Sequence, residues 1–205
     1  MVGCRNRTLN GREIYHVTHK RILWLDLETG GCRNPETESV LQLAAVLTNV
    51  EMDRVYAHQS LFIKPPDHLV THAEALAVNK IDPELTADAI PEWAAVEIFK
   101  AFVQPWLHID RMPIRLAGYN TPFDKAYCEA MLTRYDISSS GWWDEPDLDV
   151  LNWARQWLTL PRYRLVDVCD HYGIRRAKDH DALHDIYATI KVARALSAER
   201  QEVAR

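Results

Sequence analysis

RILWLDLETG, residues 21–30, places two carboxylates on an apolar strand. The run Ile22–Leu27 is typical of a buried strand, and Asp26 and Glu28 lie at its end. Residues two apart on a strand point to the same side, so both carboxylates share one face. Burying two like charges together costs several kcal/mol unless cations neutralise them. A divalent metal bound by hard oxygen ligands is the simplest way to neutralise them.

Two later segments carry further candidates for the same site. Asp124 ends LAGYNTPFD, which follows a second apolar run at 114–117, and His180 and Asp185 lie in HDALHD at the start of a helical pattern. A histidine at a helix entrance and an aspartate just over one turn later can share one pocket. Carboxylates from three segments with a neutral imidazole are typical of two-metal phosphodiester hydrolysis, in which the histidine takes a proton from the attacking water.

The order of these motifs is specific. DLET, then NTPFD, then HDALHD resembles the DEDDh branch of the 3′–5′ exonucleases, the superfamily of proofreading exonucleases and oligoribonucleases. EALAVNKI at 74–81 resembles the family's short helix and turn, and YRLVDVCDHYGI at 163–174 resembles the segment before its third motif. The resemblance covers roughly residues 20 to 197, which is almost the whole chain.

The resemblance implies a role for each matched residue. It makes His180 the general base and implies two Mg²⁺ or Mn²⁺ ions, which suit oxygen ligands. The implied metal ligands are Asp26, Glu28, Asp124 and Asp185. Substrate contacts are expected from the residues near the terminal nucleotide, from aromatic and amide groups of the second motif, and from basic residues before the third: Leu27, Thr29, Tyr119, Asn120, Arg175, Arg176 and Lys178.

The chain departs from the family pattern at three places in or beside these motifs. Gly30 and Gly31 are followed by Cys32, the second motif carries Tyr119 and Pro122 where His-Asn and a small residue are frequent, and Lys80 replaces a common glycine. These differences leave the chemistry intact but leave the substrate preference open.

Several acids and one histidine near the motifs have simpler explanations. Asp147 and Asp149 lie at an expected helix start, where acids favour the helix dipole, and Asp181 is expected to cap the last helix. His184 is the rival to His180 as base, but it points away from the face of Asp185 on the helix and is expected to be a surface or supporting residue.

The periodicity predicts an α/β domain of ribonuclease-H-like type, with a mixed five-stranded sheet flanked by helices. Strands are expected at 21–28, 40–50, 55–63 and 114–118, and helices at 72–78, 91–107, 122–135, 147–158, 163–172 and 181–198. The predicted organisation is a basic N-terminal arm (1–20), a single exonuclease domain (21–198) and a short C-terminal tail (199–205).

The composition restricts the cellular compartment and the binding partners that are expected for this chain. The four cysteines form no CxxC pair, which argues against structural zinc and disulfides and fits a reducing cytoplasm. No stretch is long and apolar enough to cross a membrane, so no membrane partner is expected. The net charge of −5 favours short or single-stranded substrates over a tight duplex grip.

The sequence therefore predicts a metal-dependent 3′–5′ exonuclease that releases nucleoside 5′-monophosphates from single-stranded ends. DNA is narrowly favoured, and an exoribonuclease of oligoribonuclease type is the alternative. A hydrolase of small phosphodiesters and a non-catalytic nucleic-acid-binding subunit are less favoured. A polymerase or another replication, repair or RNA-processing protein remains open as a partner.

Overall fold

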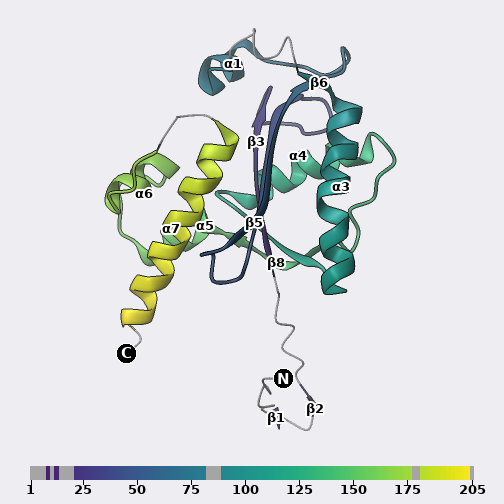
Figure 1. The fold of residues 1–205 in the computed structure, drawn as a ribbon. Helices are drawn as coiled ribbons and strands as arrows, with labels where there is room; N and C mark the ends of the chain where they lie inside the picture. The colour runs from purple at the N-terminus through teal and green to yellow at the C-terminus, as the bar shows by residue number, and fades with distance from the viewer. Residues whose placement is uncertain (1–7, 10–11, 14–20, 82–88, 177–180, 204–205) are drawn as a thin grey trace.

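The computed structural model describes residues 8–9, 12–13, 21–81, 89–176 and 181–203. At its centre lies a mixed sheet with the strand order β6-β5-β4-β3-β7-β8 (Figure 1). The strands β3, β4 and β5 are antiparallel neighbours, whereas β7 and β8 run parallel to β3 and β6 runs parallel to β5. Their bounds are Ile22–Thr29 (β3), Val40–Thr48 (β4), Val55–Lys64 (β5), Ile90–Pro91 (β6), Ile114–Gly118 (β7) and Trp143–Asp149 (β8).

Helices cover both faces of this sheet (Figure 1). One face packs against α3 (Glu92–Asp110) and α4 (Thr121–Thr133). The other packs against α5 (Val150–Trp157), α6 (Leu165–His171) and α7 (Ala182–Val203). The short helix α1 (Ala73–Asn79) lies beside the end of β3, and β1 (Thr8–Leu9) and β2 (Arg12–Glu13) pair as a small antiparallel ribbon. The predicted α/β class with a mixed sheet is confirmed.

The alternation of β3 decides where its carboxylates go. Leu23, Leu25 and Leu27 belong to the core under α3 and α4, whereas Ile22 and Trp24 belong to the core under α5, α6 and α7. Because side chains alternate along a strand, Asp26 and Glu28 share the side of Ile22 and Trp24. Both carboxylates therefore face the layer that contains α7.

The strand β4 is buried along its whole length, as its almost wholly apolar sequence predicts. It lies between β3 and β5, so both of its edges are hydrogen-bonded, and its side chains enter the cores on both faces of the sheet: Leu43 and Leu47 on one side, Ala44 and Val46 on the other. Trp24 on β3 reaches across to β4 and donates a hydrogen bond to the Thr48 hydroxyl at 2.9 Å, which satisfies its indole N–H inside the core.

Three predictions about individual elements were wrong. The described sheet has six strands where five were expected, and two of the six, Ile90–Pro91 at one edge and Trp143–Asp149 at the other, lie outside the four strand segments that the sequence located. Residues 147–149 end β8 instead of beginning a helix, and this strand lies at the sheet edge, where Pro146 is tolerated. The last helix continues to Val203, beyond its expected end at 198. Gly173 follows α6 with φ 64°, which confirms the predicted helix end.

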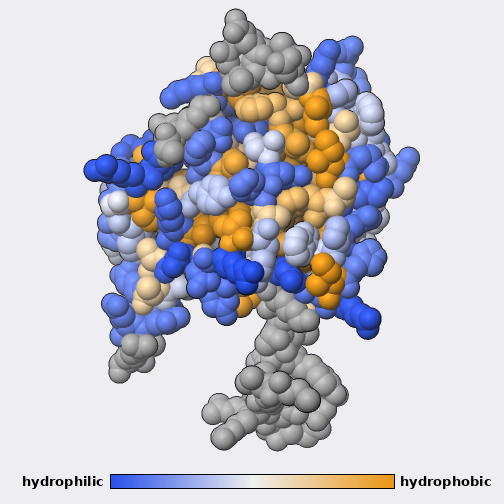
Figure 2. Space-filling model, viewed as in Figure 1, coloured by the Kyte–Doolittle hydropathy of each residue, from blue (hydrophilic) through white to orange (hydrophobic). Residues whose placement is uncertain are grey.

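The view in Figure 2 shows hydrophobic side chains towards the middle of one face and hydrophilic side chains along its margins. This distribution follows from the layers, because the middle of the face lies over the sheet and the margins are the outer sides of the helices (Figures 1 and 2). Among the described residues, no helix combines the length and the apolar character that a membrane crossing requires.

A buried ion pair joins α3 to α4. Glu92 is 1% exposed, and its two carboxylate oxygens accept hydrogen bonds from the guanidinium of Arg134 at 2.8 and 3.1 Å. The same guanidinium donates to the Pro35 carbonyl at 3.2 Å. Arg134 thus ties two helices to the loop that follows β3.

Replacing Arg134 with Met should destabilise the fold by about 3–5 kcal/mol, because Glu92 would remain buried without its cation. The double variant Glu92→Gln/Arg134→Met should recover part of this loss. Urea unfolding of both variants, with the exposed Arg54→Met as control, measures the effect. A single variant as stable as the control would show that the pair contributes little.

Candidate nuclease active site

The two carboxylates of β3 lie where the strand meets α7. Glu28 is 8% exposed, and Asp26 lies two residues before it on the same face. Across the strand pair, Glu28 is opposite Gln42 of β4. The side-chain oxygen of Gln42 accepts a hydrogen bond from the Ala182 backbone N–H at 3.3 Å, and its amide donates to the Ser60 hydroxyl at 3.0 Å. Gln42 thereby fixes the first residue of α7 beside Glu28.

Asp185 lies in the first turn of α7. This turn is capped by Asp181, which accepts a hydrogen bond from the His184 backbone N–H at 3.2 Å, as the sequence predicts. His184 itself is largely exposed and contacts Asp181 at 3.0 Å, which agrees with its expected supporting position. Arg176 donates to a carboxylate oxygen of Asp185 at 2.7 Å.

Asp124 enters the site from the first turn of α4. It is 3% exposed, and its carboxylate accepts a hydrogen bond from the Leu27 backbone N–H at 2.9 Å. This bond reaches from α4 to β3, between the two acids of that strand. The helix begins after Asn120, which has the left-handed conformation (φ 71°) that asparagine tolerates better than most residues.

The electrostatics of these acids are those of a crowded anionic cluster. Burial raises the pKa of Glu28 to about 8, with Asp185 and Asp181 adding to the shift and Arg176 opposing it. Burial also raises the pKa of Asp26 well above its ordinary value, with Asp124, Glu28 and Asp185 contributing. The pKa of Asp124 is raised as well, mainly by burial, although the Leu27 N–H opposes the shift. The carboxylates are therefore close enough to repel one another.

This donor set fits a divalent cation. The acids supply hard oxygens, and their raised pKa values reflect negative charge that a cation would relieve. In the described part of the chain, no three His, Cys, Asp or Glu side chains already stand in metal-holding positions. Asp124 and Asp185 each direct one oxygen to a protein N–H group, so small side-chain movements would accompany binding.

The predicted substrate residues separate into three places. Leu27 and Thr29 line a pocket of about 640 Å³ together with Glu28. Arg175 and Arg176 line a second pocket, beyond the end of α6, while Tyr119 and Asn120 line a third, between α5 and α6. His180 and Lys178 lie outside the described residues.

The sequence did not point to several residues that form the 640 Å³ pocket, which we call the β3–α1 pocket. The apolar part of its wall is formed by Ala75, Val78 and Phe123. The polar part is formed by Glu38, His72 and Asn79. One signal was available in the glycine pair after Thr29. A Cβ on Gly31 would lie 2.2 Å from the Glu38 carboxyl carbon, so a glycine is needed where the carboxylate crosses the backbone.

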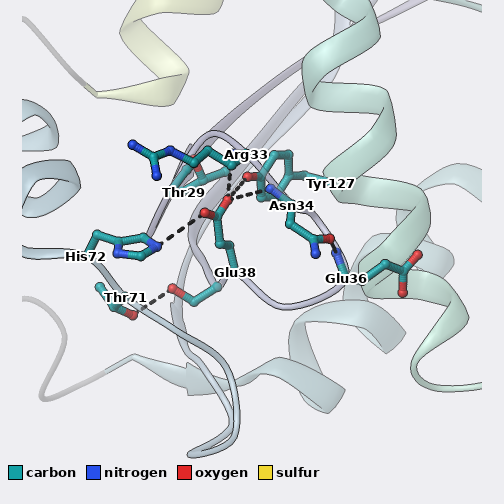
Figure 3. Close-up of polar contacts among 10 residues, drawn as sticks. Thr29, Arg33, Asn34, Glu36, Glu38, Thr71, His72 and Tyr127 are labelled. Carbon is teal, nitrogen blue, oxygen red and sulfur yellow. Dashed lines mark hydrogen bonds and ion pairs between the residues drawn. The ribbon is translucent and has the colours of Figure 1, made fainter.

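Glu38 is the polar centre of this pocket (Figure 3). Its carboxylate accepts hydrogen bonds from the Tyr127 hydroxyl and from the backbone N–H groups of Arg33 and Asn34, at 2.9 and 3.0 Å for the latter two. His72 Nε2 lies 3.3 Å from the other oxygen. Burial alone would raise the pKa of Glu38, but these hydrogen bonds outweigh it and lower the pKa to about 2. Glu38 therefore stays ionised and holds the loop after β3 in place.

The helix α1 is attached to the end of β3 by one backbone and one side-chain hydrogen bond. The His72 N–H donates to the Gly30 carbonyl at 2.7 Å, and the Asn79 amide donates to the Thr29 carbonyl at 2.8 Å. Lys80 ends the helix in the left-handed conformation with φ 51°, which explains why a glycine is favourable there. Lysine at this position accepts a modest conformational cost.

The fold and the clustered acids define a class. A mixed sheet with helices on both faces is the ribonuclease-H-like arrangement, and the chain superposes with a TM-score of 0.76 on Escherichia coli exonuclease I bound to single-stranded DNA in a zinc-ion-bound form. The identity is 25%, over 90% of this chain and 42% of that one.

The family model RNase_T, described as exonuclease, matches residues 23–193, and the chain belongs to this family of 3′–5′ exonucleases. Its relatives include exodeoxyribonuclease I of Escherichia coli (strain K12), 28% identical over 87% of this chain and 40% of the relative. Oligoribonuclease of Nitrosomonas eutropha is 24% identical over 83% of this chain and 90% of the relative. The chain thus spans less than half of the exodeoxyribonuclease. The nucleases of this family are metal-dependent.

The raised pKa of Glu28 predicts a pH-dependent stability in EDTA. An acid whose pKa is higher in the folded state stabilises the fold below its unfolded pKa, and this contribution is lost as the pH rises from about 4.5 to about 8. Glu28→Gln lacks this titration. The melting temperature of Glu28→Gln minus that of the wild type should therefore increase by several degrees as the pH rises through that window.

Differential scanning calorimetry at pH 5 and pH 8, with and without magnesium, measures this difference. Magnesium should raise the melting temperature of the wild type at pH 8 more than that of Glu28→Gln. Exposed Glu97→Gln on α3 is the matched control. Parallel stability curves for wild type and Glu28→Gln would contradict the assigned environment of Glu28.

Proposed function

We propose that the chain hydrolyses phosphodiester bonds at the 3′ ends of single-stranded nucleic acid and releases nucleoside 5′-monophosphates. The observation that carries the proposal is the position of Glu28. It belongs both to the acidic cluster with Asp26, Asp124 and Asp185 and to the wall of the β3–α1 pocket. A nucleoside seated in that pocket has its linking phosphate next to the acids.

Each acid has a stated role in this proposal. Asp26, Glu28, Asp124 and Asp185 hold two Mg²⁺ or Mn²⁺ ions. When bound, such ions promote formation of the attacking hydroxide and stabilise the leaving oxygen. His180 takes the proton from the attacking water as general base. Leu27 packs beside the terminal base, and Thr29 contacts the terminal sugar.

The protein residues also prepare the site before substrate arrives. The Leu27 N–H holds the Asp124 carboxylate, and Gln42 holds the start of α7, which carries Asp185. Asp124 and Asp185 are therefore each oriented by a different neighbouring strand. Arg176 offsets part of the negative charge at Asp185. Such orientation reduces the reorganisation needed when a phosphodiester enters.

We propose DNA as the preferred strand and RNA as the second candidate. DNA is supported by the similarity to exodeoxyribonuclease I, whose structure was solved with single-stranded DNA. RNA is supported by the oligoribonuclease, of which the matched region covers 90%. Cleavage of matched 5′-labelled DNA and RNA strands, with free and blocked 3′ ends, decides between them. The incubations contain magnesium, manganese or EDTA.

A polymerase or another repair or RNA-processing protein is a further candidate partner.

Replacing Asp26 with Asn should lower kcat/KM on the better strand by at least about a thousandfold, because a metal ligand that acts in the transition state is lost. Asp26→Asn should remain folded, since it removes charge from a crowded anionic cluster. Single-turnover cleavage measures the effect, with Glu97→Gln on the surface of α3 as control. Ordinary cleavage by pure Asp26→Asn would overturn the assignment.

The rate should depend on pH through His180. An unperturbed histidine has a pKa near 6.5, so kcat/KM should fall about tenfold per pH unit below that value if a neutral imidazole is required. His180→Gln should lose about 10²–10⁴-fold in rate and lose this slope. A His184→Gln variant is the matched control. An unchanged slope in His180→Gln would remove this residue from the base role.

A further inference from the structure

A basic pocket lies apart from the acidic cluster, between α5 and α6. It encloses about 510 Å³, and we call it the α5–α6 pocket. Its lining includes three arginines, two tyrosines and an asparagine and contains no carboxylate: Arg155, Arg162, Arg164, Tyr119, Tyr163 and Asn120. This composition contrasts with the net charge of −5 for the whole chain.

Part of this positive charge is not neutralised by ion pairs. Arg155 is exposed and has no hydrogen-bond or ion-pair partner among the described residues. The side chain of Arg162 is 68% exposed and lies 3.7 Å from Asp167. Arg164 binds the same Asp167 with two hydrogen bonds of 2.9 Å. Arg162 and Arg164 therefore share the carboxylate of Asp167, and Asp149, which accepts a hydrogen bond from the Asn120 backbone N–H at 3.0 Å, is a second acid beside the pocket. Three guanidinium groups against two carboxylates leave a small excess of positive charge at the pocket.

The walls of the pocket are held in place by internal hydrogen bonds. The Tyr119 hydroxyl donates to the Tyr163 carbonyl at 2.6 Å. The Tyr163 hydroxyl donates to the Leu158 carbonyl at 2.9 Å and accepts from the Leu160 N–H at 3.1 Å. Since both hydroxyls are engaged with the backbone, the loop between α5 and α6 is closed on itself. The arginines project from a fixed base, which lowers the entropy cost of binding a ligand.

Two segments of the chain lead from this pocket to the acidic cluster. Asn120 lines it and immediately precedes α4, whose first turn carries Asp124, about 6 Å further along the helix axis. At the other end, the α6 helix leads to Arg175 and Arg176, and Arg176 binds Asp185. Basic side chains thus flank both ends of α6, over a length of about 10 Å. Strongly hydrophilic side chains are visible in the region of α6 in Figure 2.

We propose that the α5–α6 pocket binds phosphate groups of the strand upstream of the 3′-terminal nucleotide. This inference rests on the proposed function, because the strand must reach the acids at its other end. Guanidinium groups match phosphate geometry and bind it without regard to base. Strands long enough to reach the pocket bind more tightly than short oligonucleotides, which occupy only the β3–α1 pocket.

The test uses Arg155→Gln/Arg162→Gln. Neither arginine donates a close hydrogen bond within the described structure, whereas Arg164 forms the capping box of α6 and is left unchanged. Arg54→Gln/Lys100→Gln removes two charges from other elements and is the matched control. Fluorescence anisotropy in EDTA measures the affinity for labelled thymidylate strands of about three and about twelve residues at several salt concentrations. Circular dichroism confirms that both variants fold.

The double variant should bind the longer strand about tenfold more weakly at low salt. Its salt slope should be smaller by about 1.4, which corresponds to two phosphate contacts on a single strand. Affinity for the shorter strand should change less than twofold. An unchanged affinity for the longer strand would overturn the proposal, and so would an equal loss with both lengths.

An oligoglutamate of matched charge separates a strand site from a general acidic-polymer site. Equally tight binding of this peptide, lost equally in the double variant, would overturn the proposal in favour of an acidic protein segment. The binding assay requires neither metal nor turnover. A chain that binds as expected but never cleaves would therefore contradict only the proposed function, and a chain that cleaves but shows no length dependence would contradict only this pocket.

Discussion

The burial of two carboxylates on β3 is the constraint on which the rest of the structure depends. The strand is covered on both faces, and its alternation turns Asp26 and Glu28 towards the helical layer that contains α7. Placing them with Asp124 and Asp185 raises their pKa values by burial and repulsion. Such a cluster is unfavourable for stability alone, so its presence in the middle of a packed domain indicates chemistry.

Hydrogen bonds from neighbouring elements hold this acidic cluster in place. Asp124 reaches the Leu27 N–H from α4, and Gln42 receives the first N–H of α7. Behind the neighbouring pocket, Glu38 is kept ionised by Tyr127, which also lies on α4, and by two loop N–H groups. The helix that supplies a site acid therefore also holds the loop that shapes the β3–α1 pocket. This shared support couples the position of the acids to the position of the pocket.

The separation of the acidic cluster from the arginines around α6 explains in physical terms how a chain of negative net charge could bind a polyanion. Negative charge is gathered at Asp26 and its neighbours, where divalent cations can offset it, whereas arginines gather around α6. The two regions meet at Arg176, which binds Asp185. A net charge of −5 therefore does not describe the field that a strand would meet along this face.

The sequence was most informative where a local pattern has one physical solution. The apolar run around Asp26, the fully buried β4 and the glycine after α6 were all recognisable, because strand alternation and helix termination depend on nearby residues. The strand β8 was missed because WDEPDLD carries a proline and four acids. Such a segment becomes a strand only because the edge of β7 offers it partners.

By itself, the sequence determined the α/β class, the family resemblance and the acids that could share a site, since each follows from residue type and order. Only the tertiary structure decided that Glu38, His72 and Asn79 form the pocket beside Glu28, and that Tyr119 and Leu27 lie in different pockets. Residues such as Tyr127 and Glu38 are 89 positions apart in the chain. No local pattern encodes that distance, because the sheet and its covering helices bring such residues together only when the whole domain folds.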